Sequence, residues 1–199
     1  MCEKLIDVKN KLYMDFFLEL DNKLAKGKVV VAIEGGSASG KSTLAEVLSS
    51  EYDCTIFHMD DFFLRPEQRN TQRYSEVGGN IDKERFIDEV LRNLNNDKLC
   101  YRKFDCSTMG LGDEIVVTLK SLIIVEGVYS MHPEFGKYYD LSLYLDISSE
   151  LQTKRILRRN SSIFAQRFFN EWIPLENEYF NNTNIKERCD MIIEVCDTN

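Results

Sequence analysis

Long apolar runs, signal sequences and paired cysteines are missing from this sequence. No apolar run in the 199 residues approaches the ~20 residues that a membrane-spanning helix needs. The first ten residues, MCEKLIDVKN, lack the uninterrupted apolar segment of a signal peptide. None of the six cysteines forms a C-x-x-C pair, so we interpret them as reduced thiols. These absences predict a cytoplasmic protein without a membrane partner.

Positive charge is also scarce. The sequence has 25 Lys and Arg residues against 33 Asp and Glu residues, which gives a net charge of −8. Because nucleic-acid binders are more often basic, this balance argues against a nucleic-acid partner. No internal repeat, low-complexity tract or linker interrupts the chain, so we expect one domain over 1–199. It would consist of an extra N-terminal helix in 1–26 and a core in 28–195, and self-association into a homo-oligomer stays open.

Five short apolar runs rich in β-branched residues recur along the chain. Continuous apolar runs of this length are typical of strands buried on both faces, as in parallel sheets. Helical patterns separate the runs, so we expect right-handed crossovers and an α/β fold, a three-layer sandwich around a five-stranded parallel sheet. The predicted strands are 28–34, 54–59, 121–127, 141–147 and 190–195.

The predicted helices precede or separate these strands. Asp82 is a candidate helix start, and Ser148 with Ser149 forms a second one, because such side chains can cap a helix. Two further stretches, 98–106 and 114–120, predict a small β-excursion. Helical patterns occupy 5–20, 42–51, 82–96, 148–160 and 164–180.

A glycine-rich turn with one lysine follows the first predicted strand. Residues 35–42, GGSASGKS, match G-x-x-x-x-G-K-[ST], whose small residues let backbone N–H groups surround phosphate oxygens at the start of a helix. Lys41 can reach the terminal phosphates, and the Ser42 hydroxyl can bind Mg²⁺. A chance match has a probability of about 1%, and a flexible glycine turn is the alternative. We expect a nucleoside triphosphate to be bound by Gly35, Gly36, Ser37, Ala38, Ser39, Gly40, Lys41, Ser42 and Thr43.

Carboxylates follow two of the predicted strands. Asp60 and Asp61 end the second run, and Glu126 ends the third. In parallel α/β sheets ligands bind beyond the carboxyl ends of the strands, where phosphoryl transfer needs a carboxylate near the acceptor hydroxyl and acids near Mg²⁺. We therefore predict Asp60 as the base, also able to reach the metal, and Glu126 as the acid on the metal side. The alternative for each is a helix cap or a surface acid, and it is stronger for Asp61, since adjacent carboxylates do not easily point the same way.

The one concentrated basic string is KRILRRN. Lys154 precedes Arg155, Arg158 and Arg159, and these three arginines share one side of a predicted helix. Their functional interpretation is a lid that neutralises the charge of the transferring phosphate. The alternative is a solvated helix face.

Together these residues resemble the uridine kinase-like group of P-loop kinases, which includes relatives acting on ribulose phosphate and pantothenate. The resemblance covers most of 28–195 and leaves the N-terminal helix outside. It implies a P-loop kinase fold with a small β-excursion and a short lid. The strings that carry it, in order, are GGSASGKST, DDFFLRPEQR, GGNIDKERF, FDC, IVEGVYSMHP, YDLSLYLD and EWIPLENEYF.

Roles for individual residues follow from this resemblance. Asp60 matches the catalytic aspartate of the group, and Asp82 matches the aspartate that binds ribose hydroxyls. Glu126 matches the glutamate near Mg²⁺. Arg155 and Arg158 match lid arginines.

The nucleobase end of the site departs from the group. Phe104 falls where an aromatic residue borders the base, with Phe63 nearby, although core packing would explain both equally well. Uridine–cytidine kinases carry a base-reading histidine a few residues later, whereas this chain has FDCSTMG there. Phe63 also replaces a tyrosine, and the lid segment 159–167 is short. The resemblance therefore implies intact phosphate machinery and an altered set of base-reading residues.

The leading hypothesis is an ATP- and Mg²⁺-dependent kinase for the 5′-hydroxyl of a nucleoside, uridine or cytidine first. Asp60 would accept the hydroxyl proton, and Lys41, Mg²⁺ and the lid arginines would stabilise charge on the γ-phosphoryl group.

One alternative is a kinase of another small alcohol, such as a sugar phosphate or pantothenate. A second is a nucleotide-binding regulatory module, although the N-K-x-D and D-x-x-G motifs of a GTPase are missing. A third is an inactive ATP sensor, which the intact Lys41, Ser42, Asp60 and Glu126 argue against.

Overall fold

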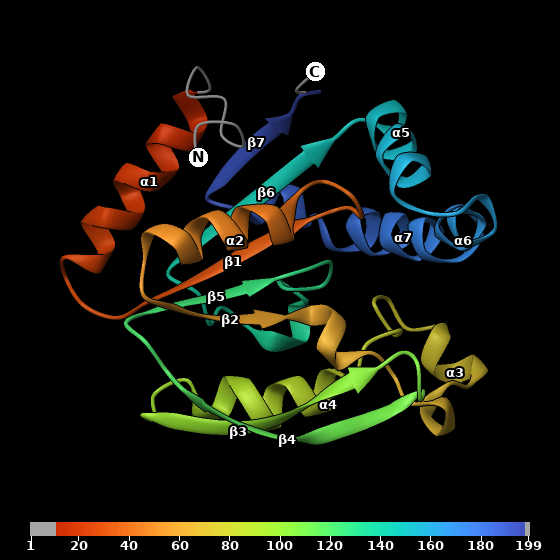
Figure 1. Cartoon of the computed structure of the whole chain (residues 1–199), viewed down its shortest axis with the longest axis horizontal. Helices are drawn as coiled ribbons and strands as arrows, with labels where there is room; N and C mark the ends of the chain where they lie inside the picture. The colour runs from red at the N-terminus through yellow and green to blue at the C-terminus, as the bar shows by residue number, and fades with distance from the viewer. Residues whose placement is uncertain (1–10, 198–199) are drawn as a thin grey trace.

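A five-stranded parallel sheet lies at the centre of the computed structural model, which describes residues 11–197. The spatial order of the strands is β2-β5-β1-β6-β7, and every neighbouring pair is parallel (Figure 1). All five predicted strands are therefore confirmed, with bounds within one residue. The strands are β1 Val29–Gly35, β2 Cys54–His58, β5 Leu122–Glu126, β6 Leu141–Ile147 and β7 Met191–Val195.

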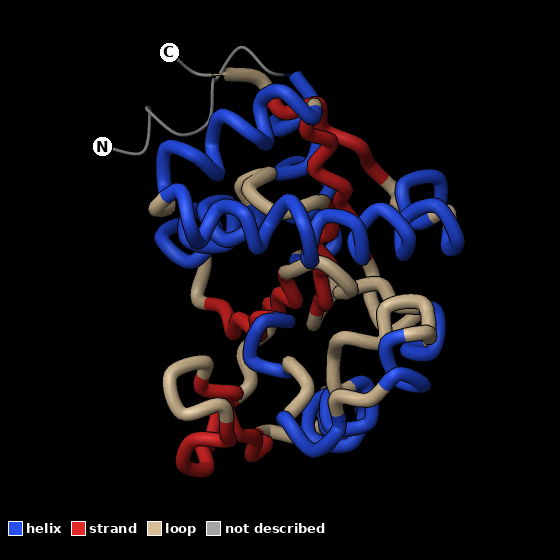
Figure 2. Tube along the Cα trace, turned by 90° about the vertical axis from the view of Figure 1, so that its right-hand side faces the viewer, coloured by secondary structure: helices blue, strands red, loops and turns tan. Residues whose placement is uncertain are grey.

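Helices cover both faces of this sheet (Figure 2). On one face Phe16 of α1 and Leu44 of α2 pack in a cluster with Val31. On the other face Ala32 packs in a cluster that includes Tyr179 of α7. Successive β1 residues thus face opposite clusters, which explains why the strand is apolar throughout, and the three-layer sandwich is confirmed. The helices are α1 Lys11–Leu24, α2 Lys41–Glu51, α3 Thr71–Tyr74, α4 Lys83–Arg85, α5 Ser149–Arg159, α6 Ser162–Arg167, α7 Ile173–Thr183 and α8 Ile185–Arg188.

The N-terminal helical pattern, predicted over 5–20, is only partly within the described residues. The part that is described forms the first ten positions of α1, and 5–10 lies outside. None of the helices within 11–197 has the length and apolar character needed to cross a membrane.

The predicted β-excursion is a separate two-stranded antiparallel sheet below β2 (Figure 1). It consists of β3 Lys98–Asp105 and β4 Gly110–Thr118. Tyr101 of β3 joins it to the main core, because its ring lies 5.5 Å from that of Phe57 and 5.7 Å from that of Phe62.

Two predicted helices contain widened turns. The predicted helix 82–96 starts at Asp82, whose carboxylate accepts the Arg85 N–H at 3.2 Å, but α4 passes into a π-type turn over Phe86–Val90. A second π-type turn, Phe168–Trp172, separates α6 from α7. Pro174 explains this second turn, because it has no N–H to donate to the carbonyl four residues earlier.

The helix start at Ser148 is as predicted. Its hydroxyl accepts the N–H of Leu151 at 3.2 Å, and α5 begins at Ser149. Side chains of α5 then reach the glycine-rich turn, where Gln152 and Arg155 donate to loop carbonyls.

Candidate active site

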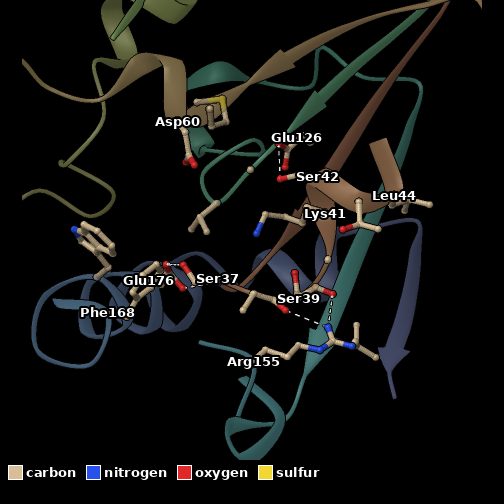
Figure 3. A pocket seen from close by; sticks show the side chains of 18 of the residues that line it. Ser37, Ser39, Lys41, Ser42, Leu44, Asp60, Glu126, Arg155, Phe168 and Glu176 are labelled. Atoms are coloured by element: carbon tan, nitrogen blue, oxygen red, sulfur yellow. Dashed lines mark hydrogen bonds between the residues drawn. The ribbon is translucent and has the colours of Figure 1, made fainter. Parts of the chain in front are cut away.

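A cavity of about 1300 Å³ opens at the carboxyl ends of the central strands (Figure 3). It is lined by the glycine-rich loop that follows β1, by residues after β2 and β5, and by parts of α5, α6 and α7. The topology therefore brings the predicted phosphate loop and both predicted strand-end carboxylates into one cavity.

The phosphate loop folds tightly between β1 and α2. Gly35 has φ 139°, and a Cβ atom there would lie 2.5 Å from the Leu145 carbonyl oxygen, so only glycine fits. Gly40 has φ 105° at the start of α2. The Lys41 ammonium donates to the carbonyl oxygens of Gly35 at 2.8 Å and Gly36 at 3.0 Å. The loop thus holds its lysine over the position that phosphate groups would take.

Side chains of α5 hold the loop from outside. Gln152 donates to the Ser37 carbonyl at 2.9 Å, and Arg155 donates to the carbonyls of Ala38 at 3.1 Å and Ser39 at 3.3 Å. In a trans peptide the C=O and the following N–H point in opposite directions, so outward carbonyls turn the next N–H groups inward. In this structure Arg155 shapes the loop, in addition to the lid role that the resemblance implied.

Glu176 of α7 is a site residue that the sequence reasoning missed. Its carboxylate is 4% exposed, accepts the Ser37 N–H at 2.9 Å and is hydrogen-bonded by the Ser37 hydroxyl. Burial raises the pKa of Glu176, and the bonds from Ser37 oppose that shift. The string EWIPLENEYF contained Glu176, but no local signal marked it as a residue of the phosphate loop.

The two acids that follow β2 point in different directions. Asp60 faces the cavity, where surrounding protein atoms raise the pKa of its carboxyl and the Lys41 charge lowers it. Asp61 instead accepts the Tyr101 hydroxyl at 3.3 Å and pairs with the Lys103 ammonium at 3.1 Å. Only the first of the two adjacent acids therefore faces the cavity.

Glu126, at the end of β5, lies beside the start of α2. Its Oε1 atom is 3.0 Å from the Ser42 hydroxyl oxygen and 2.6 Å from His58 Nδ1. The bond to Glu126 raises the pKa of His58, and the burial of the ring opposes it.

These oxygen groups suit a magnesium ion. Mg²⁺ prefers hard oxygen ligands and is usually held by one or two carboxylates together with waters and substrate phosphates. Ser42 and Glu126 are in contact, and Asp60 lies close enough to Glu126 to affect its own pKa. No group of three or more His, Cys, Asp or Glu side chains able to hold a metal occurs within 11–197, so phosphate oxygens would have to complete the shell.

Of the predicted substrate residues, Asp60 and Phe63 line the cavity, whereas Phe104 and Asp82 are not part of its lining. Phe104 is 7% exposed and packs edge-on against Phe63 at 6.3 Å, behind the lining. Asp82 is 1% exposed, and its carboxylate binds the Gln68 amide at 2.8 Å as well as capping α4. The ribose-binding role of Asp82 stays a prediction, which would require release of Gln68.

Two polar groups that the sequence reasoning missed also belong to this part of the cavity. Asn80 and Tyr129 both line it, and neither the Asn80 Oδ1 atom nor the Tyr129 hydroxyl has a hydrogen-bond partner among residues 11–197. Burial raises the pKa of Tyr129, and the nearby Asn80 opposes that shift, although the two side chains lack hydrogen-bond geometry. Tyr129 also has φ 76°, a left-handed conformation that is strained for a tyrosine.

Aromatic side chains of α6 and of the π-type turn that follows it also line the cavity. Phe164, Phe168 and Trp172 pack together, with 4.5 Å between the ring centres of Phe168 and Trp172. Arg158 also lines the cavity. The predicted lid arginines Arg155 and Arg158 thus share the cavity with an apolar wall, and their lid role stays a prediction.

The sheet order and the phosphate loop define the fold of a P-loop kinase. A solved structure described as a possible uridine kinase from Bacillus stearothermophilus has this fold, with a TM-score of 0.67 and 22% identity, over 91% of this chain and 98% of the other. A putative fructose transport system kinase from Silicibacter sp. TM1040 aligns with a TM-score of 0.53 and 20% identity, over 84% and 90% of the two chains.

Curated relatives of similar sequence are named uridine kinases. A uridine kinase of Anoxybacillus flavithermus is 23% identical over 85% of this chain and 87% of its own length. A uridine kinase of Clostridium perfringens is 24% identical over 84% of this chain and 88% of its own length. No family model matches the chain. These likenesses confirm the resemblance to uridine kinase-like P-loop kinases, and they support a small-molecule kinase of the P-loop type.

Proposed function

We propose that this protein transfers the γ-phosphoryl group of ATP, in the presence of Mg²⁺, to the 5′-hydroxyl of a nucleoside, uridine or cytidine first. The observation that carries the proposal is the meeting of Lys41, Ser42, Asp60 and Glu126 in one cavity at the ends of parallel strands. The names of the curated relatives support the choice of uridine as the first acceptor to test.

Individual residues of the chain would have separate roles in the transfer. Asp60 accepts the proton of the acceptor hydroxyl, whose oxygen then bonds to the γ-phosphorus as the bond to the β-phosphate oxygen breaks and ADP leaves. Lys41, Arg158 and the inward N–H groups of the loop stabilise the charge on the transferring group. Mg²⁺, held by Ser42 and Glu126 with Asp60 nearby, would supply charge neutralisation between the phosphates.

A kinase of a different small alcohol is the second candidate, and the state of Asp82 favours it. Its carboxylate is engaged by Gln68 and by the start of α4, so in this structure it offers no free ligand for a ribose cis-diol. Cys106, which lines the cavity, also belongs to the stretch that lacks the base-reading histidine.

A coupled ADP-release assay would decide between the two candidates. Uridine, cytidine, other nucleosides, sugar phosphates and pantothenate would each be offered with ATP and Mg²⁺. Turnover with uridine or cytidine is the expected result. Turnover with another alcohol alone would keep the mechanism and replace the acceptor, and ATP binding without any turnover would contradict the proposal.

A further inference from the structure

Helix α1 lies outside the region of family resemblance, yet it borders the cavity. Phe16 and Leu20 anchor α1 on one face of the main sheet, and both are fully buried. Near the start of the same helix, Tyr13 is half-buried and lines the cavity. The proposed chemistry leaves this tyrosine without a role.

The cavity has two ends, which the phosphate loop separates. Figure 3 shows Asp60 and Phe168 on one side of Lys41, whereas Leu44 and Arg155 lie on the other. If Asp60 takes the acceptor proton, the γ-phosphate faces Asp60. The nucleoside of the donor must then extend away from Asp60, past the start of α2, because the loop and the helix start hold the phosphates between them.

Tyr13 lies at this second end, together with Arg155 and the segment that follows β7. Arg155 connects the phosphate loop to the segment after β7. It donates to the loop carbonyls of Ala38 and Ser39 and, at 3.2 Å, to the carbonyl of Cys196. The Tyr13 hydroxyl is close to the same groups: burial raises its pKa, Arg155 lowers it and Cys196 raises it. Thr43 and Cys196 line the cavity alongside Tyr13.

We propose that Tyr13 forms one wall of the subsite for the nucleobase of the donor nucleotide, so that the extra helix α1 takes part in nucleotide binding. This inference rests on the proposed function, since it takes its direction from the position of Asp60. An aromatic face stacks on any base and contributes affinity with little base preference. Tyr13 therefore strengthens binding of ATP and GTP alike, and it contributes nothing to the binding of phosphate groups alone.

Isothermal titration of the full chain with ATP, GTP and inorganic tripolyphosphate tests this subsite. Y13A is expected to weaken ATP and GTP about tenfold, the typical loss when a stacking ring is removed. Tripolyphosphate affinity should stay at the wild-type value, and Y13F should bind all three as the wild type does. Y13L, which keeps an apolar side chain for packing, provides the same comparison if Y13A folds poorly. Y74A removes an exposed tyrosine of α3 and serves as the matched control.

The outcomes separate this inference from the proposed function. Wild-type ATP affinity in both Y13A and Y13L would overturn the base subsite and leave the kinase proposal standing. An equal loss for ATP and tripolyphosphate would also overturn it, because the substitution would then act on the loop. A wild-type protein that does not bind ATP would overturn the proposed function itself.

Discussion

Two parts of the cavity differ in how firmly protein contacts hold them: the phosphate end, which is the part around the phosphate loop, and the acceptor end, which lies on the Asp60 side of that loop. Around the phosphate loop, Gln152, Arg155, Glu176 and Lys41 all bond to the loop backbone. At the acceptor end, the Asn80 Oδ1 atom and the Tyr129 hydroxyl have no partner among the described residues, and within the loop the buried Ser39 hydroxyl also lacks one. The phosphate end is thus preorganised for a ligand common to all P-loop kinases, whereas the acceptor end keeps polar groups free for a ligand of its own.

Lys41→Met tests the phosphate end and should have a larger effect than any substitution at the acceptor hydroxyl groups. Because the ammonium is the charge that the loop holds over the phosphate position, we expect kcat/KM for ATP to fall about 10³-fold. Steady-state kinetics with varied ATP and then varied acceptor would measure it. If the substitution changed only the KM of the acceptor and left kcat/KM for ATP unchanged, this division of the cavity would be contradicted.

Glu34, buried near the end of β1, bonds both to the start of the phosphate loop and to the segment that follows β5. Its carboxylate accepts the N–H of Gly35 at 3.0 Å, the N–H of Met131 at 3.1 Å and the Tyr179 hydroxyl at 3.1 Å. Burial raises the pKa of Glu34 from 4.5 to about 7. Above pH 4.5 the unfolded chain releases this proton more readily than the folded chain does. Stability should therefore fall as the pH rises to 7, by about 3 kcal/mol from this group.

Urea unfolding at pH 5 and pH 8 would measure this effect. Glu34→Gln carries no titratable group, so its free energy of unfolding should change less between the two pH values than that of the wild type. The same pH dependence in both proteins would show that Glu34 titrates normally. Glu19→Gln, which removes an exposed acid of α1, is the control.

Tyr129→Phe tests the acceptor end and should have a much smaller effect than Lys41→Met. If the hydroxyl bonds to the acceptor, its removal should raise the KM of the acceptor about three- to tenfold and leave the KM of ATP unchanged. The ring packing on Tyr179, at 4.7 Å between ring centres, is retained in the variant. An unchanged acceptor KM with unchanged or higher stability would mean that the hydroxyl serves no ligand.

The sequence predicts features that depend on local patterns and misses those that depend on packing between distant segments. The sheet and the phosphate loop follow from local patterns, apolar runs and a spaced motif, and the structure has both. Glu176 could not be predicted, because it meets Ser37 across 139 residues of sequence and only the packing of α7 brings them together. The orientation of Arg155 depends likewise on where α5 docks, and helical spacing shows only which residues share a face.

Asp82 illustrates the limit of motif matching. The sequence correctly marked it as a helix start, but the bond to Gln68 depends on the turn that brings 66–68 next to α4. Tyr129 carried no sequence signal, since its importance arises from a left-handed backbone and an unpartnered hydroxyl that only coordinates reveal.

Phosphoryl transfer in this cavity depends, in our proposal, on Asp60 as the base, and two adjacent substitutions test this role. Single-turnover phosphoryl transfer would be measured with Asp60→Asn and Asp61→Asn, alongside ATP affinity for each. We predict that Asp60→Asn binds ATP but transfers 10²- to 10⁴-fold more slowly, whereas Asp61→Asn, whose acid faces Tyr101 and Lys103, stays within a few-fold of the wild type. Equal transfer rates in the wild type and Asp60→Asn would contradict the account.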